Sequence, residues 1–305
     1  MASVVIVAAG EMTYNPKTRT LCRLRLCARG IATFERCQVL LNEQRETPFD
    51  LKFRLFGTSV RVSPFFWLIT IFMFWDYIHP PRGGPEFLVI VVLCVFVSIL
   101  LHEFGHIWMG RVFGSHGHIV MQGGCGLAVG SGGQPYRWQR IVVSLAGPGI
   151  QFLFWGILLA LMTLVLPPIQ NRYVEFTLDR LLFINFWWAV INLLPVWPLD
   201  GGQVSRELFT WASRYNGVRY SLALSLVTAA LVTINAISGA CGGPTLPWMP
   251  TGDRFFIFFF AIFTIESFIL MQAELARSHG GGWRDPDDSD RLPWESDPDD
   301  WKRGR

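Results

Sequence analysis

The chain has 305 residues, of which 51% are hydrophobic and only 16% are charged. The mean hydropathy is positive, and Leu, Ile, Val and Phe occur in blocks of about 20 residues, the length that crosses a bilayer. This composition argues against an ordinary soluble protein. The net charge of +3 is small and spread along the chain, so it gives no case for a nucleic-acid partner.

The first fifty residues mix basic residues with three cysteines and show no sustained hydrophobic period. We interpret residues 1–50 as a cytosolic extension of uncertain structure. No cleaved signal is expected, because no basic residue precedes the short apolar run near the start. The six cysteines of the chain follow no paired spacing, so a disulfide framework is not expected either.

Six apolar segments of membrane length follow, bounded by charges, prolines and glycines. They lie at about 60–78, 87–113, 138–166, 179–197, 218–240 and 254–275. The sequence therefore predicts an all-α polytopic membrane protein, with about six transmembrane helices in a domain that spans residues 51–275. The tail from 276 to 305 is rich in glycine and mixed charge and cannot bury a core, so we expect it to be disordered.

The basic residues near the segment ends predict the orientation of the protein. One set of flanks is much richer in lysine and arginine than the other, and the richer side of a membrane protein faces the cytoplasm. The richer set consists of Lys52, Arg54, Arg61, Arg111, Arg137, Arg140, Arg206, Arg214, Arg219 and Arg277, and the opposite set of Arg82, Arg172, Arg180 and Arg254. We therefore expect a multi-pass protein of the cell membrane with both termini in the cytoplasm.

The second segment contains the sequence HEFGH at residues 102–106. Residues four apart share one face of a helix, so His102 and His106 can both point toward a single ion, with Glu103 beside it. This spacing is typical of helices in which two imidazoles hold zinc and the glutamate acts as general base. The alternative is a pair of hydrogen-bonded core histidines. Polar groups are costly in an apolar span, so the setting favours a functional site.

A glycine-rich loop follows this segment. It contains two strand-like runs, His118–Gln122 and Cys125–Val129, around Gly123 and Gly124. It is consistent with a short β-hairpin-like element, whose edge could receive an extended substrate by strand addition. A flexible connector explains the same composition equally well. His116 and His118 lie in or next to this loop, and we do not expect them to bind metal.

The fourth segment ends in INLLPVWPLDGGQV, where Pro195 and Pro198 break the helix and Asp200 precedes two glycines. A catalytic zinc site needs three protein ligands and an open fourth position. The expected orientation brings Asp200 to the same side of the membrane as the histidine pair. Irregular backbone at membrane depth is tolerated where it lines a wet cavity. Taken alone, however, the Asp-Gly-Gly sequence is better explained as a turn at the membrane surface.

Taken together, HEFGH and the later run from Asn192 through Pro195 and Pro198 to Asp200 resemble the site-2 protease family of intramembrane zinc metalloproteases. The resemblance covers about residues 51–275, in a minimal form without PDZ or CBS domains. It implies that one Zn²⁺ per chain is held by His102, His106 and Asp200, with Glu103 as the general base. It also implies that Asn192 faces the cavity and contacts the substrate or the transition state.

The implied activity is hydrolysis of peptide bonds in or near the transmembrane segments of membrane proteins, within the lipid bilayer. Neither the substrate's identity nor the oligomeric state can be predicted. Two positions depart from the family pattern: Gln151 replaces the usual asparagine of the sequence SLAGPGIQF, and Ser63 stands where many members carry histidine. The role of Gln151 is therefore left open.

Three further polar residues lie in the apolar segments. We interpret Glu266 as a structural carboxyl that is hydrogen-bonded between helices, and Asn185 and Asn235 as interhelical contacts. Three alternative functions are a metal transporter, a catalytically silent membrane scaffold and a soluble type of zinc protease anchored in the membrane. The transporter has no use for Glu103, the complete ligand set disfavours the scaffold, and the position of HEFGH within a span disfavours the anchored enzyme.

Overall fold

The computed structural model of the protein describes residues 46–79, 83–123, 125–131, 134–165, 170–243, 245–246 and 254–280. The expected cytosolic extension lies outside these ranges except for its last five residues. The charged tail beyond Gly280 also lies outside them. What the sequence suggests about those two ends stays a prediction.

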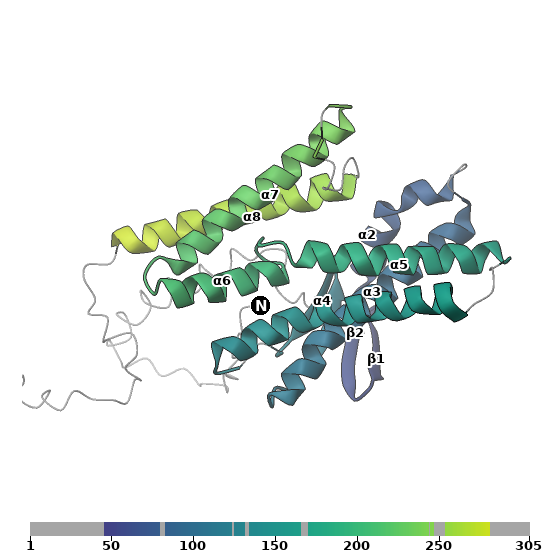
Figure 1. The fold of residues 1–305 in the computed structure, drawn as a ribbon, viewed down its shortest axis with the longest axis horizontal. Helices are drawn as coiled ribbons and strands as arrows, with labels where there is room; N and C mark the ends of the chain where they lie inside the picture. The colour runs from purple at the N-terminus through teal and green to yellow at the C-terminus, as the bar shows by residue number, and fades with distance from the viewer. Residues whose placement is uncertain are drawn as a thin grey trace, which may run out of the picture.

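The described chain is mostly helical, and its long helices are gathered into two groups (Figure 1). In chain order the helices are α2 (Pro64–Met73), the short η2 (Trp75–Ile78), α3 (Pro85–Val112), α4 (Arg137–Ala160) with its wider final turn η3 (Leu161–Val165), α5 (Arg172–Asn192), α6 (Asp200–Ala212), α7 (Gly217–Ala240) and α8 (Arg254–Gly280).

Four of these helices are long and apolar enough to cross a membrane. They cover Pro85–Val112, Arg137–Leu164, Gly217–Ala240 and Ile257–Ala276. The expected count of six is thus not met by length and composition in the described part of the chain. Helix α2 has only ten residues, about 15 Å of rise against a hydrocarbon core of about 30 Å. Helix α5 has 21 residues, but four of its first nine are charged.

A four-stranded sheet packs beside α3 and corrects the expectation of an all-α chain. Strands β1 (Leu51–Leu55) and β2 (Thr58–Val62) form an antiparallel hairpin, and β2 pairs in parallel with β3 (His118–Gln122). Strand β3 pairs antiparallel with β4 (Cys125–Val129), and these two strands have the bounds of the two strand-like runs in the glycine-rich loop. The strand order β1-β2-β3-β4 leaves β4 at one edge of the sheet.

The hairpin of β1 and β2 has a local cause. Lys52 and Arg54 alternate with Phe53 and Leu55, which is the period of a strand with one buried face. The turn runs through Phe56 and Gly57, which both have positive φ, as a tight two-residue hairpin turn requires. The apolar helix therefore begins only at Pro64, rather than near residue 60.

Helix α3 lies at the centre of the larger group of helices. It packs against α2, α4 and α5, and against β3 and β4. Its buried side chains form the main hydrophobic cluster together with residues of the sheet and of α2 and α5, such as Val60, Phe66, Ile99, Phe104 and Ile119. The segment that carries HEFGH is thus held on all sides by the protein, and its position is tightly defined.

Helices α7 and α8 pack on each other as the second group (Figure 1). Helix α6 joins the two groups because it contacts both α4 and α7. The turn after α5 inserts Val196 between α7 and α8, where it joins a cluster with Ala229 and Phe260. Nearby, the Ser225 hydroxyl accepts a hydrogen bond from the Trp197 backbone N–H, at 2.7 Å.

Helices α3 and α4 cross at two glycines. A Cβ at Gly105 would lie 2.5 Å from the carbonyl oxygen of Ala146, and a Cβ at Gly147 would lie 2.6 Å from His106 Cε1 and 2.9 Å from His102 Cε1. Real Cβ contacts are not this short, so the crossing distance requires glycine at both positions. The close approach brings α4 directly against the histidine pair.

This crossing predicts an unusual response to alanine. In a helix interior, Gly→Ala normally stabilises by about 1 kcal/mol. We expect Gly105→Ala to do the opposite and to cost about 1–3 kcal/mol, because the added methyl overpacks the α3–α4 contact. The matched control is Gly149→Ala on α4, where a Cβ would meet no atom within 4 Å. Thermal unfolding in detergent measures both variants, and equal midpoints would contradict the crossing.

Candidate metal centre

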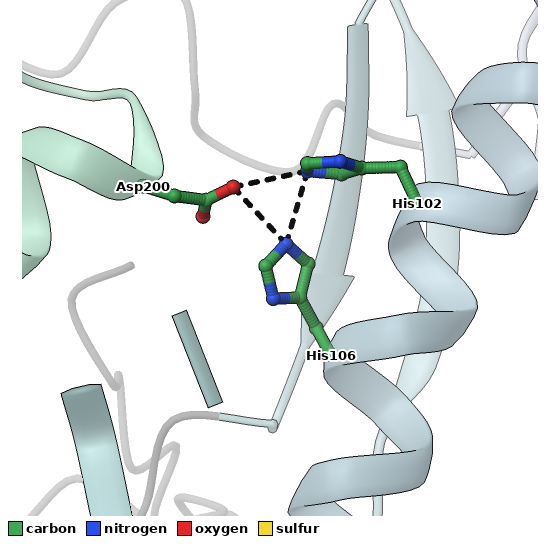
Figure 2. A group of neighbouring side chains, drawn as sticks. All are labelled: His102, His106 and Asp200. Carbon is green, nitrogen blue, oxygen red and sulfur yellow. Dashed lines mark hydrogen bonds and ion pairs between the residues drawn. The ribbon is translucent and has the colours of Figure 1, made fainter. Parts of the chain in front are cut away.

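Three polar side chains from two separate parts of the chain converge beside the α3–α4 crossing (Figure 2). His102 and His106 lie one turn apart on α3, and their Nε2 atoms are 3.0 Å apart. Asp200 is the first residue of α6, and its Oδ2 lies 3.0 Å from His102 Nε2 and 3.4 Å from His106 Nε2. All three side chains are buried. The structure thus brings together the three residues that were expected to bind metal.

Close backbone packing at the start of α6 places Asp200 at this point. A Cβ at Gly201 would overlap the carbonyl oxygen of Leu193, and a Cβ at Gly202 would lie 2.5 Å from that of Val196. The two glycines therefore let α6 begin directly against the turn that precedes it, and the Asp-Gly-Gly sequence is more than a surface turn. Further along α6, Glu207 accepts a two-pronged ion pair from Arg140 of α4, at 2.8 and 3.0 Å.

The hydrogen bonds on the far side of each imidazole decide which ring nitrogen is free. His106 Nδ1 lies 2.7 Å from the carbonyl oxygen of Val143, which can only accept, so Nδ1 carries the hydrogen. His102 Nδ1 lies 2.9 Å from Gln151 Oε1, also an acceptor. In the neutral imidazoles, both Nε2 atoms then present lone pairs toward Asp200.

When both imidazoles are neutral, three electron-pair donors therefore face one another without a hydrogen between them. Apart from these two imidazoles, Oδ2 of Asp200 has no hydrogen-bond donor among the described residues, and it is buried. Such an arrangement is repulsive unless a cation lies between the donors. The three ligand atoms lie within 4.8 Å of one another, so this group could hold one metal ion. Two imidazole nitrogens and one carboxylate oxygen are ligands that suit Zn²⁺.

Glu103 lies beside this group without belonging to it. Its side chain is buried, and the backbone N–H of Ala128 in β4 donates a hydrogen bond to the carboxylate. The other oxygen, Oε2, is buried and has no hydrogen-bond partner in the described part of the chain. A Cβ at Gly126 would lie 2.5 Å from Glu103 Oε1, so the edge strand β4 approaches the carboxylate closely. The site thus offers one positioned carboxylate oxygen able to take a proton.

The other residues singled out in the sequence lie elsewhere. Asn192 Nδ2 donates to the Trp188 carbonyl within its own helix, at 2.9 Å, so its described bond does not reach the metal group. His116 and His118 lie outside the group. Asn185 makes an interhelical bond to Ser98, at 2.9 Å.

Two other polar residues of the apolar segments differ from their expected roles. Both carboxylate oxygens of Glu266 are buried and lack a hydrogen-bond partner among the described residues, which corrects the expected bond between helices. Asn235 accepts a bond from the backbone N–H of Leu246 at 2.7 Å, beyond the end of α7, and not from another helix.

Sequence reasoning missed Gly147 and left Gln151 undecided, although both touch the histidine pair. Both lie in the sequence SLAGPGIQF of α4, whose small residues were the available signal for a close helix approach. Their contacts depend on how α4 crosses α3, which no local pattern reveals.

Comparisons with known proteins find similarity to zinc metalloproteases. Residues 168–234 match the family model described as peptidase family M50, a range that includes Asp200 and excludes the histidine pair. The chain is 28% identical over 165 residues to a putative zinc metalloprotease of Synechocystis sp., covering 50% of this chain and 42% of that protein. It is 25% identical over 161 residues to a zinc metalloprotease of Methanocaldococcus jannaschii, covering 50% and 45%.

The match thus spans less than half the length of these two relatives. Among solved structures, the site-2 protease from Methanocaldococcus jannaschii aligns with 78% of this chain and 99% of that one, at 18% identity and a TM-score of 0.46. The family match and the sequence relatives confirm the resemblance found in the sequence: residues 168–234 match peptidase family M50, and both relatives carry the name zinc metalloprotease.

Proposed function

We propose that this chain is an intramembrane zinc metalloprotease that hydrolyses peptide bonds in or near the transmembrane segments of membrane proteins. One observation carries the proposal: the lone pairs of His102, His106 and Asp200 converge beside the unpartnered carboxylate oxygen of Glu103. Both sequence relatives described above bear the name zinc metalloprotease, one of them as putative, and this supports zinc as the metal.

In this proposal His102 Nε2, His106 Nε2 and Asp200 Oδ2 hold one Zn²⁺ per chain. Three protein ligands are the number found in catalytic zinc sites, which keep a fourth position open. Bound zinc supplies Lewis acidity to the reacting carbonyl and to water. The carboxylate of Asp200 also offsets part of the metal charge, which two neutral imidazoles cannot do in a low-dielectric setting.

Glu103 is the general base of the proposed reaction. Its free Oε2 accepts a proton from the attacking water and later delivers that proton to the nitrogen of the leaving amine. The hydrogen bond from the Ala128 N–H keeps the carboxylate oriented during both transfers. Asn192 is the proposed contact to the substrate or the transition state, since its one described hydrogen bond leaves an amide hydrogen and the amide oxygen available.

The substrate segment would lie in extended form along β4. Protease chemistry needs an unwound backbone, and β4 is an edge strand that already directs one backbone N–H, that of Ala128, toward Glu103. Strand addition uses main-chain hydrogen bonds and so tolerates many side chains. This supports a membrane-spanning protein as the partner, in the lipid bilayer, without selecting a particular one.

We further propose that α2 and α5 lie in the membrane with the four apolar helices. Helix α5 packs against both α3 and α4. Its 21 residues rise about 31 Å, which matches the hydrocarbon core. Its early charges are partly matched within the protein, since Arg180 donates to Asp179 and, at 3.0 Å, to the Tyr77 hydroxyl. In this arrangement the excess of lysine and arginine on one set of flanks supports a cytoplasmic position for both termini.

A metal transporter or a catalytically silent membrane scaffold is the alternative. Neither has a use for a buried carboxylate that stands beside the ligand group and points an unpartnered oxygen into the protein. A purified wild-type chain that retains zinc and cleaves no membrane protein would favour these alternatives.

The first test of the activity is Glu103→Gln. Glutamine fills nearly the same space and can still accept from Ala128, but it cannot take a proton. We expect normal zinc content and loss of proteolysis, measured by zinc analysis of the detergent-solubilised protein and by quantitative comparison of membrane-protein fragments in cells. The control is Glu175→Gln at the exposed start of α5, which should cleave normally. Undiminished cleavage by Glu103→Gln would exclude this mechanism.

The orientation is tested by cysteines introduced at the two ends of α3. Glu86 lies exposed in its first turn, and His116 lies exposed just after its end. We expect Glu86→Cys to react with a membrane-impermeant maleimide in intact cells, and His116→Cys to react only after the membrane is opened. The unmodified chain gives the background from its native cysteines. The reverse labelling pattern would refute the proposed orientation.

A further inference from the structure

A buried carboxamide sits directly behind one of the proposed metal ligands. Gln151 of α4 is fully buried. Its Oε1 lies 2.9 Å from His102 Nδ1, and its Nε2 donates to the carbonyl oxygen of Ser98, at 3.2 Å. The side chain therefore joins two points of α3 that lie one turn apart, Ser98 and His102.

The Ser98 carbonyl fixes which way this amide faces. A carbonyl oxygen can only accept, so the group that faces it must be the NH₂ of Gln151. The amide oxygen is then turned toward His102, and that ring must donate from Nδ1. The hydrogen cannot be on Nε2 of the neutral ring, so the lone pair faces Asp200. The Ser98 carbonyl thus orients the Gln151 amide, and this amide in turn selects the His102 tautomer that can bind metal.

The same point of α3 is also tied to α5. Asn185 Nδ2 donates to the Ser98 hydroxyl at 2.9 Å and to the Leu181 carbonyl of its own helix at 2.8 Å. Ser98, Gln151 and Asn185 are all fully buried. Three helices therefore meet in one polar network that ends at His102. A fully buried polar side chain with both functions bonded has little freedom to turn.

We propose that Gln151 is a positioning residue that holds His102 in the Nδ1–H tautomer and aims its Nε2 at the metal. The inference rests on the proposed metal site and deepens it. His106 has a backbone carbonyl, that of Val143, in the corresponding place. His102 lacks such a backbone partner among the described residues and depends on a side chain. Groups that hold the second nitrogen of a ligand histidine typically contribute 10- to 100-fold to metal affinity.

The alternative is that Gln151 only fills space between α3 and α4. Two substitutions separate these roles. Gln151→Met has a similar volume and shape but cannot accept a hydrogen bond from His102. Gln151→Glu keeps an acceptor for His102, and in its protonated form its hydroxyl can also donate to the Ser98 carbonyl. A packing role predicts that Met is tolerated best, whereas a positioning role predicts that Glu is.

The experiment measures zinc affinity of the purified full chain in detergent by competition with a chelator, with thermal unfolding as the test of folding. We expect Gln151→Met to weaken zinc binding by about 10- to 100-fold. Gln151→Glu should stay within about threefold of the wild-type chain, or bind zinc more tightly. Glu175→Gln, at the exposed start of α5, serves as a reference that should bind zinc normally.

Wild-type affinity in Gln151→Met would overturn the inference, and so would a tenfold or larger loss in Gln151→Glu. The second criterion stands even if Gln151→Met fails to fold. Failure of the proposed metal site looks different, because the wild-type chain would then not bind zinc. Failure of the proposed protease function would appear as a wild-type chain that cleaves no membrane protein, whatever the zinc affinity of the Gln151 variants. A wild-type chain that binds zinc together with an unaffected Gln151→Met would remove only the positioning role of Gln151.

Discussion

Two acceptors behind the histidine rings determine the chemistry of the whole site. The Val143 carbonyl and the Gln151 amide oxygen take up the Nδ1 hydrogens of His106 and His102. Both Nε2 atoms are then left as lone pairs only 3.0 Å apart, with a carboxylate oxygen next to them. Three such donors in a buried place repel one another unless a cation lies between them. The rest of the structure serves to keep them there.

Close packing between helices holds these three side chains together. Glycine at 147 lets α4 touch both histidine rings, and glycine at 201 lets α6 start against the end of α5. The Arg140–Glu207 ion pair then holds α6 against α4, so that Asp200 arrives from a part of the chain almost a hundred residues away. Edge strand β4 packs against α3 and orients Glu103 through the Ala128 N–H. The proposed metal ligands therefore come from two elements, α3 and α6, and the proposed general base lies on α3 beside the two histidines.

The parts of this site that could be predicted from the sequence are those that depend on residues close together in the chain. The HEFGH motif predicts a metal site because a helix places His102 and His106 on one face. The Pro195–Pro198 break likewise indicates the change of direction before Asp200. The role of Gln151 could not be predicted, because its contacts depend on the rotation and depth of α4 against α3. The β1–β2 hairpin was not predicted from the sequence. Its alternation of polar and apolar residues is short and runs directly into an apolar segment, which hides the period of the strand.

X-ray absorption at the zinc edge of the purified wild-type chain tests the central claim most directly, because it reports ligand atoms without reference to activity. The account predicts only nitrogen and oxygen neighbours at about 2.0–2.1 Å, with the outer-shell scattering of two imidazoles. A sulfur neighbour at about 2.3 Å would contradict it, since it would bring a cysteine into the site. Scattering from a single imidazole would also contradict it, because one histidine of the α3 pair would then not bind the metal.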